Sequence, residues 1–203
     1  MTTSILLATA TVLGLLAFFE PCTIATHTLF SVRAHGFVRA QRGRELFMLW
    51  FARSALSAGL LLFGVAVTTP PGWGRVLPSA ALALMASLYL ISRRVYIPVP
   101  HLEFWRVWPR AVELPQAIKL GLTLPACTLP LFVILAALSV TLDSATAAVA
   151  AGLLFAAFFT LPTAVTAYAG LSQSGRRFLQ VTALTTAYLT ALLLYGVAAY
   201  LLL

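Results

Sequence analysis

The sequence predicts an all-α polytopic membrane protein. Of its 203 residues, 61% are hydrophobic and only 9% are charged, whereas soluble domains are nearer to half apolar and a quarter charged. No water-soluble fold of this length could bury so much apolar surface, so the expected surrounding is a lipid bilayer. The net charge of +8 comes from arginines between apolar runs, which the positive-inside rule explains. No nucleic-acid partner is expected.

Six apolar runs approach the length of about 20 residues that a transmembrane helix needs. The predicted spans are residues 4–32, 46–69, 75–91, 118–142, 144–171 and 178–203. The first run lacks a basic segment before it and is too long for a signal-peptide core, so we expect it to stay as a transmembrane helix.

Basic residues predict the orientation of these spans. They gather in alternate connections, namely at Arg33, Arg39, Arg42 and Arg44, then at Arg93, Arg94, Arg106 and Arg110, and finally at Arg176 and Arg177. Alternate connections lie on one side of a membrane, and that side is the cytoplasm by the positive-inside rule. We therefore expect a multi-pass protein of the cell membrane (inner or plasma membrane), with both termini outside.

The chain divides into two halves of opposite orientation within one transmembrane domain, 1–203. Repeat one covers about 1–92, a polar connecting segment about 93–116, and repeat two about 117–203. The first span runs inward and the fourth runs outward, so related halves would be inverted, as in many transporters. Each first span carries a similar short motif: Glu20-Pro21-Cys22-Thr23-Ile24 in one half and Pro125-Ala126-Cys127-Thr128-Leu129 in the other.

The prolines predict that the first and fourth helices are broken near Pro21 and Pro125. A proline removes a backbone donor, clashes with the preceding turn and disfavours helix in the residue before it. Cys22 and Cys127 would then lie near the N-terminus of a second half-helix, where unpaired amides and the helix dipole favour a thiolate. Such a break is tolerated only against protein or a water-filled cavity.

The two cysteines have a plain alternative role, because a free cysteine packs well as a small apolar side chain. However, Cys22 and Cys127 are the only cysteines of the chain and occupy corresponding places in its halves. A pair of thiols can carry two electrons by forming and opening a disulfide, without a cofactor. The chain offers no zinc ligand set, phosphate-binding loop or Ser/His/Asp arrangement, so neither a metal nor a cofactor is expected.

These motifs resemble those of the CcdA family, which corresponds to the transmembrane part of DsbD. The resemblance covers span number, topology and length, and at residue level Glu20-Pro21-Cys22 and Pro125-Ala126-Cys127-Thr128-Leu129-Pro130. Unlike the family's usual first motif, no proline follows Cys22. The resemblance implies two inverted three-helix repeats and a carrier of electrons from cytoplasmic thioredoxin to an outward-facing thioredoxin-like protein, usually for cytochrome c maturation. It also implies that oxidised Cys22 and Cys127 form a disulfide, which requires Cα atoms within about 7 Å.

Several polar residues of the spans would support such a site. Glu20 is a carboxyl in an apolar run, which is costly and often functional. It could relay a proton, or it could face a wet cavity or pair with Arg53. His27 is expected to be a hydrogen-bonded structural residue. Threonines near the breaks are expected to donate to freed carbonyls, namely Thr23, Thr26, Thr123 and Thr128.

Two other functions fit the composition. Six-span exporters of the LysE superfamily share this size and layout, but they would place more polar residues around a midplane site. A non-catalytic subunit of a larger membrane complex is the third possibility. An exporter should tolerate the loss of both cysteines, whereas a redox carrier should lose all activity when either is changed.

Overall fold

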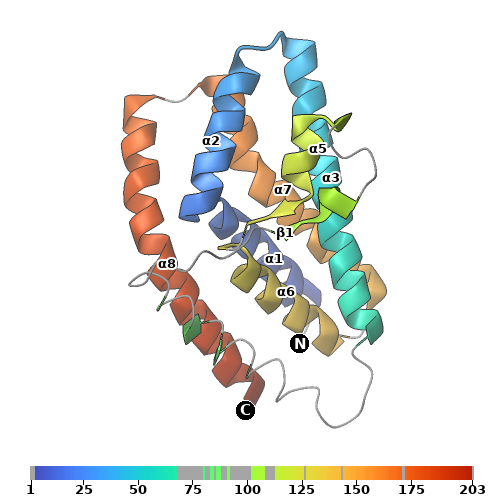
Figure 1. The fold of residues 1–203 in the computed structure, drawn as a ribbon. Helices are drawn as coiled ribbons and strands as arrows, with labels where there is room; N and C mark the ends of the chain where they lie inside the picture. The colour runs from blue at the N-terminus through green and yellow to red at the C-terminus, as the bar shows by residue number, and fades with distance from the viewer. Residues whose placement is uncertain are drawn as a thin grey trace.

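The computed structural model describes residues 3–67, 80, 83–84, 86–87, 91, 102–107, 113–125, 127–142, 144–170 and 172–202, which form a bundle of helices (Figure 1). The described helices are α1 (Thr3–Phe18), α2 (Pro21–His35), α3 (Arg39–Val67), α5 (Gln116–Gly121), α6 (Leu129–Leu142), α7 (Ala145–Ala169) and α8 (Gln173–Leu202). Two short strands, β1 (Leu102–Glu103) and β2 (Thr123–Leu124), and a 3₁₀ helix, η1 (Phe104–Val107), complete the described elements.

The helices suit a membrane. Within the described residues, α3 and α7 are long and apolar enough to cross a bilayer, and α1 with α2 makes a third crossing if that bent pair is one span. The helix α6 and residues 188–199 of α8 are shorter apolar helices. Large apolar side chains such as Phe47, Phe51 and Leu192 are exposed on the outer surface, where lipid would cover them. The predicted span 75–91 lies mostly outside the described residues.

The first predicted span is broken where the sequence predicts. The helix α1 ends at Phe18, α2 begins at Pro21, and the two are bent by 76°. Glu20 between them has an extended backbone, with φ −68° and ψ 139°. Proline at the first position of a helix costs no hydrogen bond, because the amide there has no intrahelical partner. Pro21 therefore both ends the first helix and begins the second.

The fourth predicted span is also broken, but its two pieces are not simply half-helices. After the short helix α5 the chain forms β2, and Pro125 follows before α6 begins at Leu129. The strand β2 pairs antiparallel with β1, placing Leu102 opposite Leu124 and Glu103 opposite Thr123. The chain is mostly helical, as predicted, but this pair of two-residue strands was not predicted. Backbone groups released from the helix near Pro125 bond to the middle connection instead.

The helices α3 and α7 form the centre of the packing. They pack against each other, while α7 also contacts α1 and α2 and α3 also contacts α5 and α6. Glycines bring backbones together at three of these contacts. An added Cβ at Gly14, Gly121 or Gly152 would lie 2.5, 2.8 or 2.7 Å, respectively, from a backbone atom of the facing helix. Around Gly59 and Gly64, by contrast, an added Cβ would meet no described atom within 4 Å.

The two ends of the bundle contain different parts of the chain. Both chain ends lie at one end, and the α2–α3 and α7–α8 connections lie at the other (Figure 1). Arg42 fixes the last turn of α2 there: its Nε donates to the Ala34 carbonyl at 3.1 Å, and its Nη2 donates to the carbonyls of His35 at 2.6 Å and Phe37 at 3.1 Å. The His35 Nδ1 lies 2.9 Å from the Ala167 carbonyl of α7. The C-terminal end of α2 is thus attached to both neighbouring helices.

Candidate functional site

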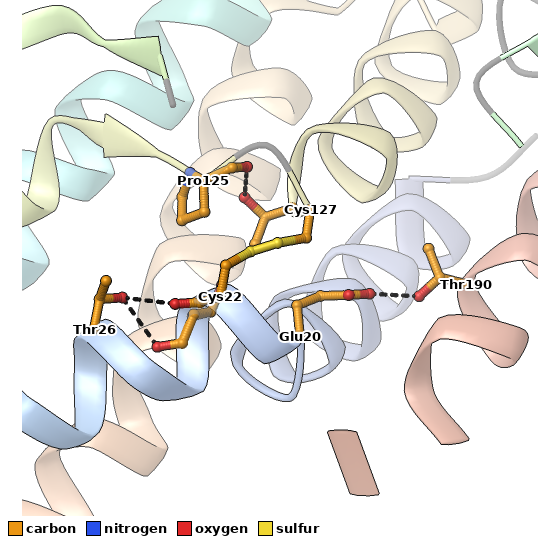
Figure 2. Close-up of a disulfide and its surroundings, with 8 residues drawn as sticks. Glu20, Cys22, Thr26, Pro125, Cys127 and Thr190 are labelled. Carbon is orange, nitrogen blue, oxygen red and sulfur yellow. Dashed lines mark hydrogen bonds between the residues drawn. A yellow bond between two sulfur atoms is a disulfide. The ribbon is translucent and has the colours of Figure 1, made fainter. Parts of the chain in front are cut away.

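Cys22 and Cys127 form a disulfide bond, although 105 positions separate them in the sequence (Figure 2). Their Cα atoms lie 6.7 Å apart, within the range that disulfides allow. Both residues are half-buried. The pairing that the family resemblance implied is therefore present, and it joins the two broken regions of the chain.

The break at Pro21 places Cys22 in the first turn of α2. The hydroxyl of Thr26 donates to the carbonyls of Cys22 at 3.2 Å and of Thr23 at 3.1 Å. Both carbonyls lie within α2, so Thr26 bonds back within its own helix and not to a carbonyl freed by the break, which was its expected role. The Thr23 hydroxyl has no hydrogen-bond partner among the described residues, although it is buried, so the same expectation is not met for Thr23 either.

Cys127 lies in the turn between Pro125 and α6. The amide and the hydroxyl of Thr128 both donate to the Pro125 carbonyl, at 3.0 and 2.9 Å, so Thr128 satisfies a carbonyl freed by the break, as expected. Pro130 is the second residue of α6, where its missing N–H is again harmless. The hydroxyl of Thr123 donates to the Lys119 carbonyl at 2.7 Å. Each cysteine therefore lies at the N-terminal end of a helix that follows a proline-induced break.

Glu20 is completely buried and lies beside the disulfide. The hydroxyl of Thr190, on α8, donates to its Oε1 at 2.7 Å, and Figure 2 shows the Glu20 side chain pointing from the break toward Thr190. Two structural alternatives were expected for this carboxyl, a wet cavity or a pair with Arg53. Complete burial argues against the first, and the Arg53 contacts described next lead to other residues.

Arg53 is the centre of a buried polar cluster between α2, α3 and α7. Its Nη2 lies 3.0 Å from the Nε2 of His27, its Nη1 donates to Thr160 at 3.2 Å, and its guanidinium carbon lies 3.9 Å from the ring centre of Phe159. Because a guanidinium only donates, the Nε2 of His27 must accept. The Nδ1 of His27 then carries the hydrogen and donates to Thr163 Oγ1, 2.7 Å away. His27 therefore has the structural, fully bonded role expected for it.

The sequence reasoning did not predict this cluster, although one signal was available. Four polar residues at spacings of four occupy one face of α2, namely Thr23, His27, Ser31 and His35. Three of them contact α7. In addition to the His27 and His35 contacts, Ser31 donates to the Thr163 carbonyl at 3.2 Å. A polar face on an otherwise apolar helix indicates contact with other polar groups rather than with lipid.

The chemistry that this arrangement allows is thiol–disulfide exchange. Within the described residues, no three His, Cys, Asp or Glu side chains gather as a metal site would require. Among the described residues, the half-buried pair of sulfurs, the buried carboxyl of Glu20 and the buried guanidinium of Arg53 are the reactive or charged groups that lie within the bundle. Comparisons with models of protein families, with curated proteins and with solved structures found no match to this chain.

Proposed function

We propose that this protein is a membrane electron transporter that passes reducing equivalents from cytoplasmic thioredoxin to an outward-facing thioredoxin-like protein. The observation that carries the proposal is the Cys22–Cys127 disulfide, which joins two helix starts inside an apolar bundle. These are the only cysteines of the chain, so the pair is a self-contained carrier of two electrons. A disulfide that only stabilised the fold would not need both of its cysteines to follow helix breaks.

The exchange proceeds in two steps on each side of the membrane. A thioredoxin thiolate attacks one sulfur, the Cys22–Cys127 bond breaks, and a mixed disulfide forms. The second thiol of thioredoxin then attacks the mixed disulfide, which leaves thioredoxin oxidised and both membrane cysteines reduced. The reverse sequence reduces the outward partner. Both cysteines are half-buried, so exposure does not favour either as the first sulfur attacked.

Alternating access would let the same two sulfurs meet partners on both sides. The packing supports two inverted three-helix repeats, because α3 and α7 contact each other and each contacts both pieces of the other half's broken span. A two-fold axis between α3 and α7 would exchange these contacts. In this arrangement α3 and α7 stay in place, and the two broken spans, which carry the cysteines, move relative to them.

The cytoplasmic side is assigned to the end of the bundle that holds the α2–α3 and α7–α8 connections. Arg33, Arg39 and Arg44 are exposed at the first connection and Arg177 at the second, which agrees with the positive-inside rule. Both termini then face outward from the cell membrane. With the short motifs around its cysteines, this supports membership of the CcdA family and a role in cytochrome c maturation.

Cysteine variants test the proposal. The single variants Cys22→Ser and Cys127→Ser each leave one sulfur. At least one of them should form a stable mixed disulfide with a single-cysteine thioredoxin whose sulfur has been activated as a mixed disulfide with thionitrobenzoate, because the membrane thiolate attacks the thioredoxin sulfur and thionitrobenzoate leaves. In liposomes, the wild-type protein should couple thioredoxin oxidation on one side to reduction of a thioredoxin-like protein on the other, and the double variant should not. Electron transfer that persists in the double variant, or the absence of any trapped partner, would refute the proposal.

A small-solute exporter is the second candidate, because of the Arg53–His27 cluster. A buried guanidinium held by His27 and Thr160 is the kind of intramembrane polar group that transport sites use. An exporter should keep its transport activity in the Cys22→Ser/Cys127→Ser double variant and lose it in Arg53→Met. A redox carrier should show the opposite dependence on the cysteines.

A further inference from the structure

We propose that His27 is a proton-linked latch: its contacts hold α2 against α3 and α7 only while the ring is neutral, and separation of these helices adds one proton to it. The inference rests on the proposed electron transport, because the passage of a partner to Cys22 is what requires the helices to separate. It gives a task to a completely buried histidine that the exchange of disulfides does not itself use.

The two hydrogen bonds of the His27 ring leave no place for a second proton. Arg53 of α3 donates from Nη2 to the ring Nε2, 3.0 Å away, and the ring Nδ1 donates to Thr163 Oγ1 of α7, 2.7 Å away. A protonated imidazole has no acceptor nitrogen, and a guanidinium has only donors. A proton on Nε2 would therefore point at another donor and bring two positive charges together. The proton and the contact with Arg53 exclude each other.

The other neighbours of the ring are apolar and could not stabilise its charge in the closed arrangement. The ring stacks on Phe159 of α7, with ring centres 5.4 Å apart, and the ring of Phe18 of α1 lies edge-on at 6.0 Å. A buried charge needs a partner of opposite sign or hydrogen bonds from water. The ring can be charged stably only when α2 has moved away from Arg53 and water has entered.

The other ionisable groups on α2 and on the helices packed against it, α1, α3, α7 and α8, do not take the place of Arg53. The helix α1 carries none. Glu20 lies seven positions before His27, about 10 Å along a helix axis, and accepts a hydrogen bond from Thr190. The remaining ionisable side chains described on α2, α3, α7 and α8 are not buried, namely Arg33, His35, Arg39, Arg42, Arg44, Glu45, Tyr168, Arg177, Tyr188 and Tyr195.

His27 lies on the route from the end assigned to the cytoplasm to the disulfide. The helix α2 carries Cys22 in its first turn and ends at His35, and His27 lies between them on the face that contacts α7 through His27, Ser31 and His35. A partner that reaches Cys22 along this face must part α2 from α3 and α7, which breaks both ring contacts and admits water. A hydrated imidazole binds a proton below a pH of about 6.5, and the charged ring cannot form the contact with Arg53 again. Acid therefore favours the separated arrangement.

The test compares the rates at which a reductant opens the disulfide at different pH values. The full-length protein in lipid nanodiscs is mixed with a water-soluble phosphine, which becomes a phosphine oxide as the disulfide and one water become two thiols, and rapid labelling counts these thiols. The variant His27→Gln keeps an acceptor for Arg53 and a donor for Thr163 but does not titrate. Because both proteins meet the same reductant, its titration cancels in the ratio of the wild-type rate to the variant rate.

The ratio of the two rates should rise as the solution becomes more acid. If a proton binds only to the separated arrangement, with a midpoint near pH 6.5, the separated population and the ratio should both grow about tenfold between roughly pH 7.5 and pH 5.5. The variant His35→Gln is the matched control. His35 is exposed on the same face, and its Nδ1, 2.9 Å from the Ala167 carbonyl, still donates when the ring is protonated. This variant should keep the pH dependence of the wild type.

A ratio that stays constant with pH, or that falls toward acid, would overturn the inference. Mass spectrometry of the starting material checks that the disulfide has formed in each variant. If His27→Gln does not form it, Arg53→Met takes its place, because without the guanidinium the closed arrangement can keep a protonated ring, and the ratio of wild type to this variant should again rise toward acid.

The same experiment separates the latch from the proposed function. If the phosphine opens the disulfide but reduced thioredoxin opens it at no pH, the proposed electron transport fails, and the ratio measured with the phosphine still decides the latch. If thioredoxin opens the disulfide and the ratio is constant, the latch fails and the electron transport stands. A wild-type disulfide that the phosphine opens at no pH would contradict the latch, because acid would then not have separated the helices.

Discussion

The close contact between α3 and α7 gives a quantitative prediction for Gly152→Ala. The added Cβ would lie 2.7 Å from both the Cα and the N of Ala58. Carbon atoms in contact normally lie about 3.5–4.0 Å apart, so the two helices would have to separate locally by about 1 Å. Backbone atoms cannot rotate away as a flexible side chain can, so the strain must be taken up by the interface.

The expected cost follows from two opposing effects. Overpacking of a well-packed contact destabilises by about 1–3 kcal/mol. Replacing glycine by alanine in a helix stabilises by about 1 kcal/mol, which offsets part of this. Gly59→Ala is the matched control, because it lies on α3 and its Cβ would meet no described atom within 4 Å. It should show only the favourable effect.

The assay is equilibrium unfolding in detergent micelles, followed by circular dichroism on both variants. The free energy of unfolding of Gly152→Ala should be lower than that of Gly59→Ala by about 1–3 kcal/mol, the overpacking cost alone. Equal stability of the two variants would show that the α3–α7 backbones are not in contact at Gly152, and the packing described above would be wrong.

Two further predictions concern the polar cluster and the disulfide. Thr163→Val removes the acceptor of the His27 Nδ1 hydrogen and should lower the free energy of unfolding by about 1–3 kcal/mol. The control Thr185→Val, at an exposed position of α8, should change the free energy of unfolding by less than about 0.5 kcal/mol. Equal effects of the two variants in the same unfolding assay would contradict the buried contact. Opening the disulfide frees a loop closed over 105 positions and should lower the free energy of unfolding by up to about 4.7 kcal/mol in the chain-entropy account. Unfolding with and without a reductant measures this difference. An unchanged unfolding midpoint would mean that the bond does not constrain the unfolded chain.

The breaks in the spans could be predicted from the sequence because their causes are local. Pro21 stops one helix and starts another through its own ring and its missing amide hydrogen, and no knowledge of the remaining fold is needed. The break before Pro125 was predictable for the same reason. The strand β2 was not, because it depends on pairing with β1 about 20 residues earlier, and two-residue strands leave no periodic pattern.

The candidate site likewise has one part that the sequence could predict and another part that depends on how distant helices pack. The pairing of Cys22 with Cys127 followed from a family resemblance and from the absence of any other cysteine. The Arg53–His27 contact and the Thr190 hydrogen bond to Glu20 join different helices, and their partners lie 26 and 170 positions apart. The relative rotation and height of the packed helices decide such contacts. The polar face of α2 indicates that polar partners exist, but the hydrophobic pattern does not say which residues of the other helices they are.

Arg42 donates two hydrogen bonds to the last turn of α2 and one to Phe37 just after it, and this has a mechanical consequence. These bonds fasten one end of a 15-residue rod, about 22 Å long at 1.5 Å per residue, while Cys22 sits at the opposite end. If α2 tilts while this end is held, the end that carries Cys22 moves furthest. A tilt of 15° would carry the sulfur-bearing tip through roughly 6 Å, calculated from the same rise per residue, and the held end would stay almost still.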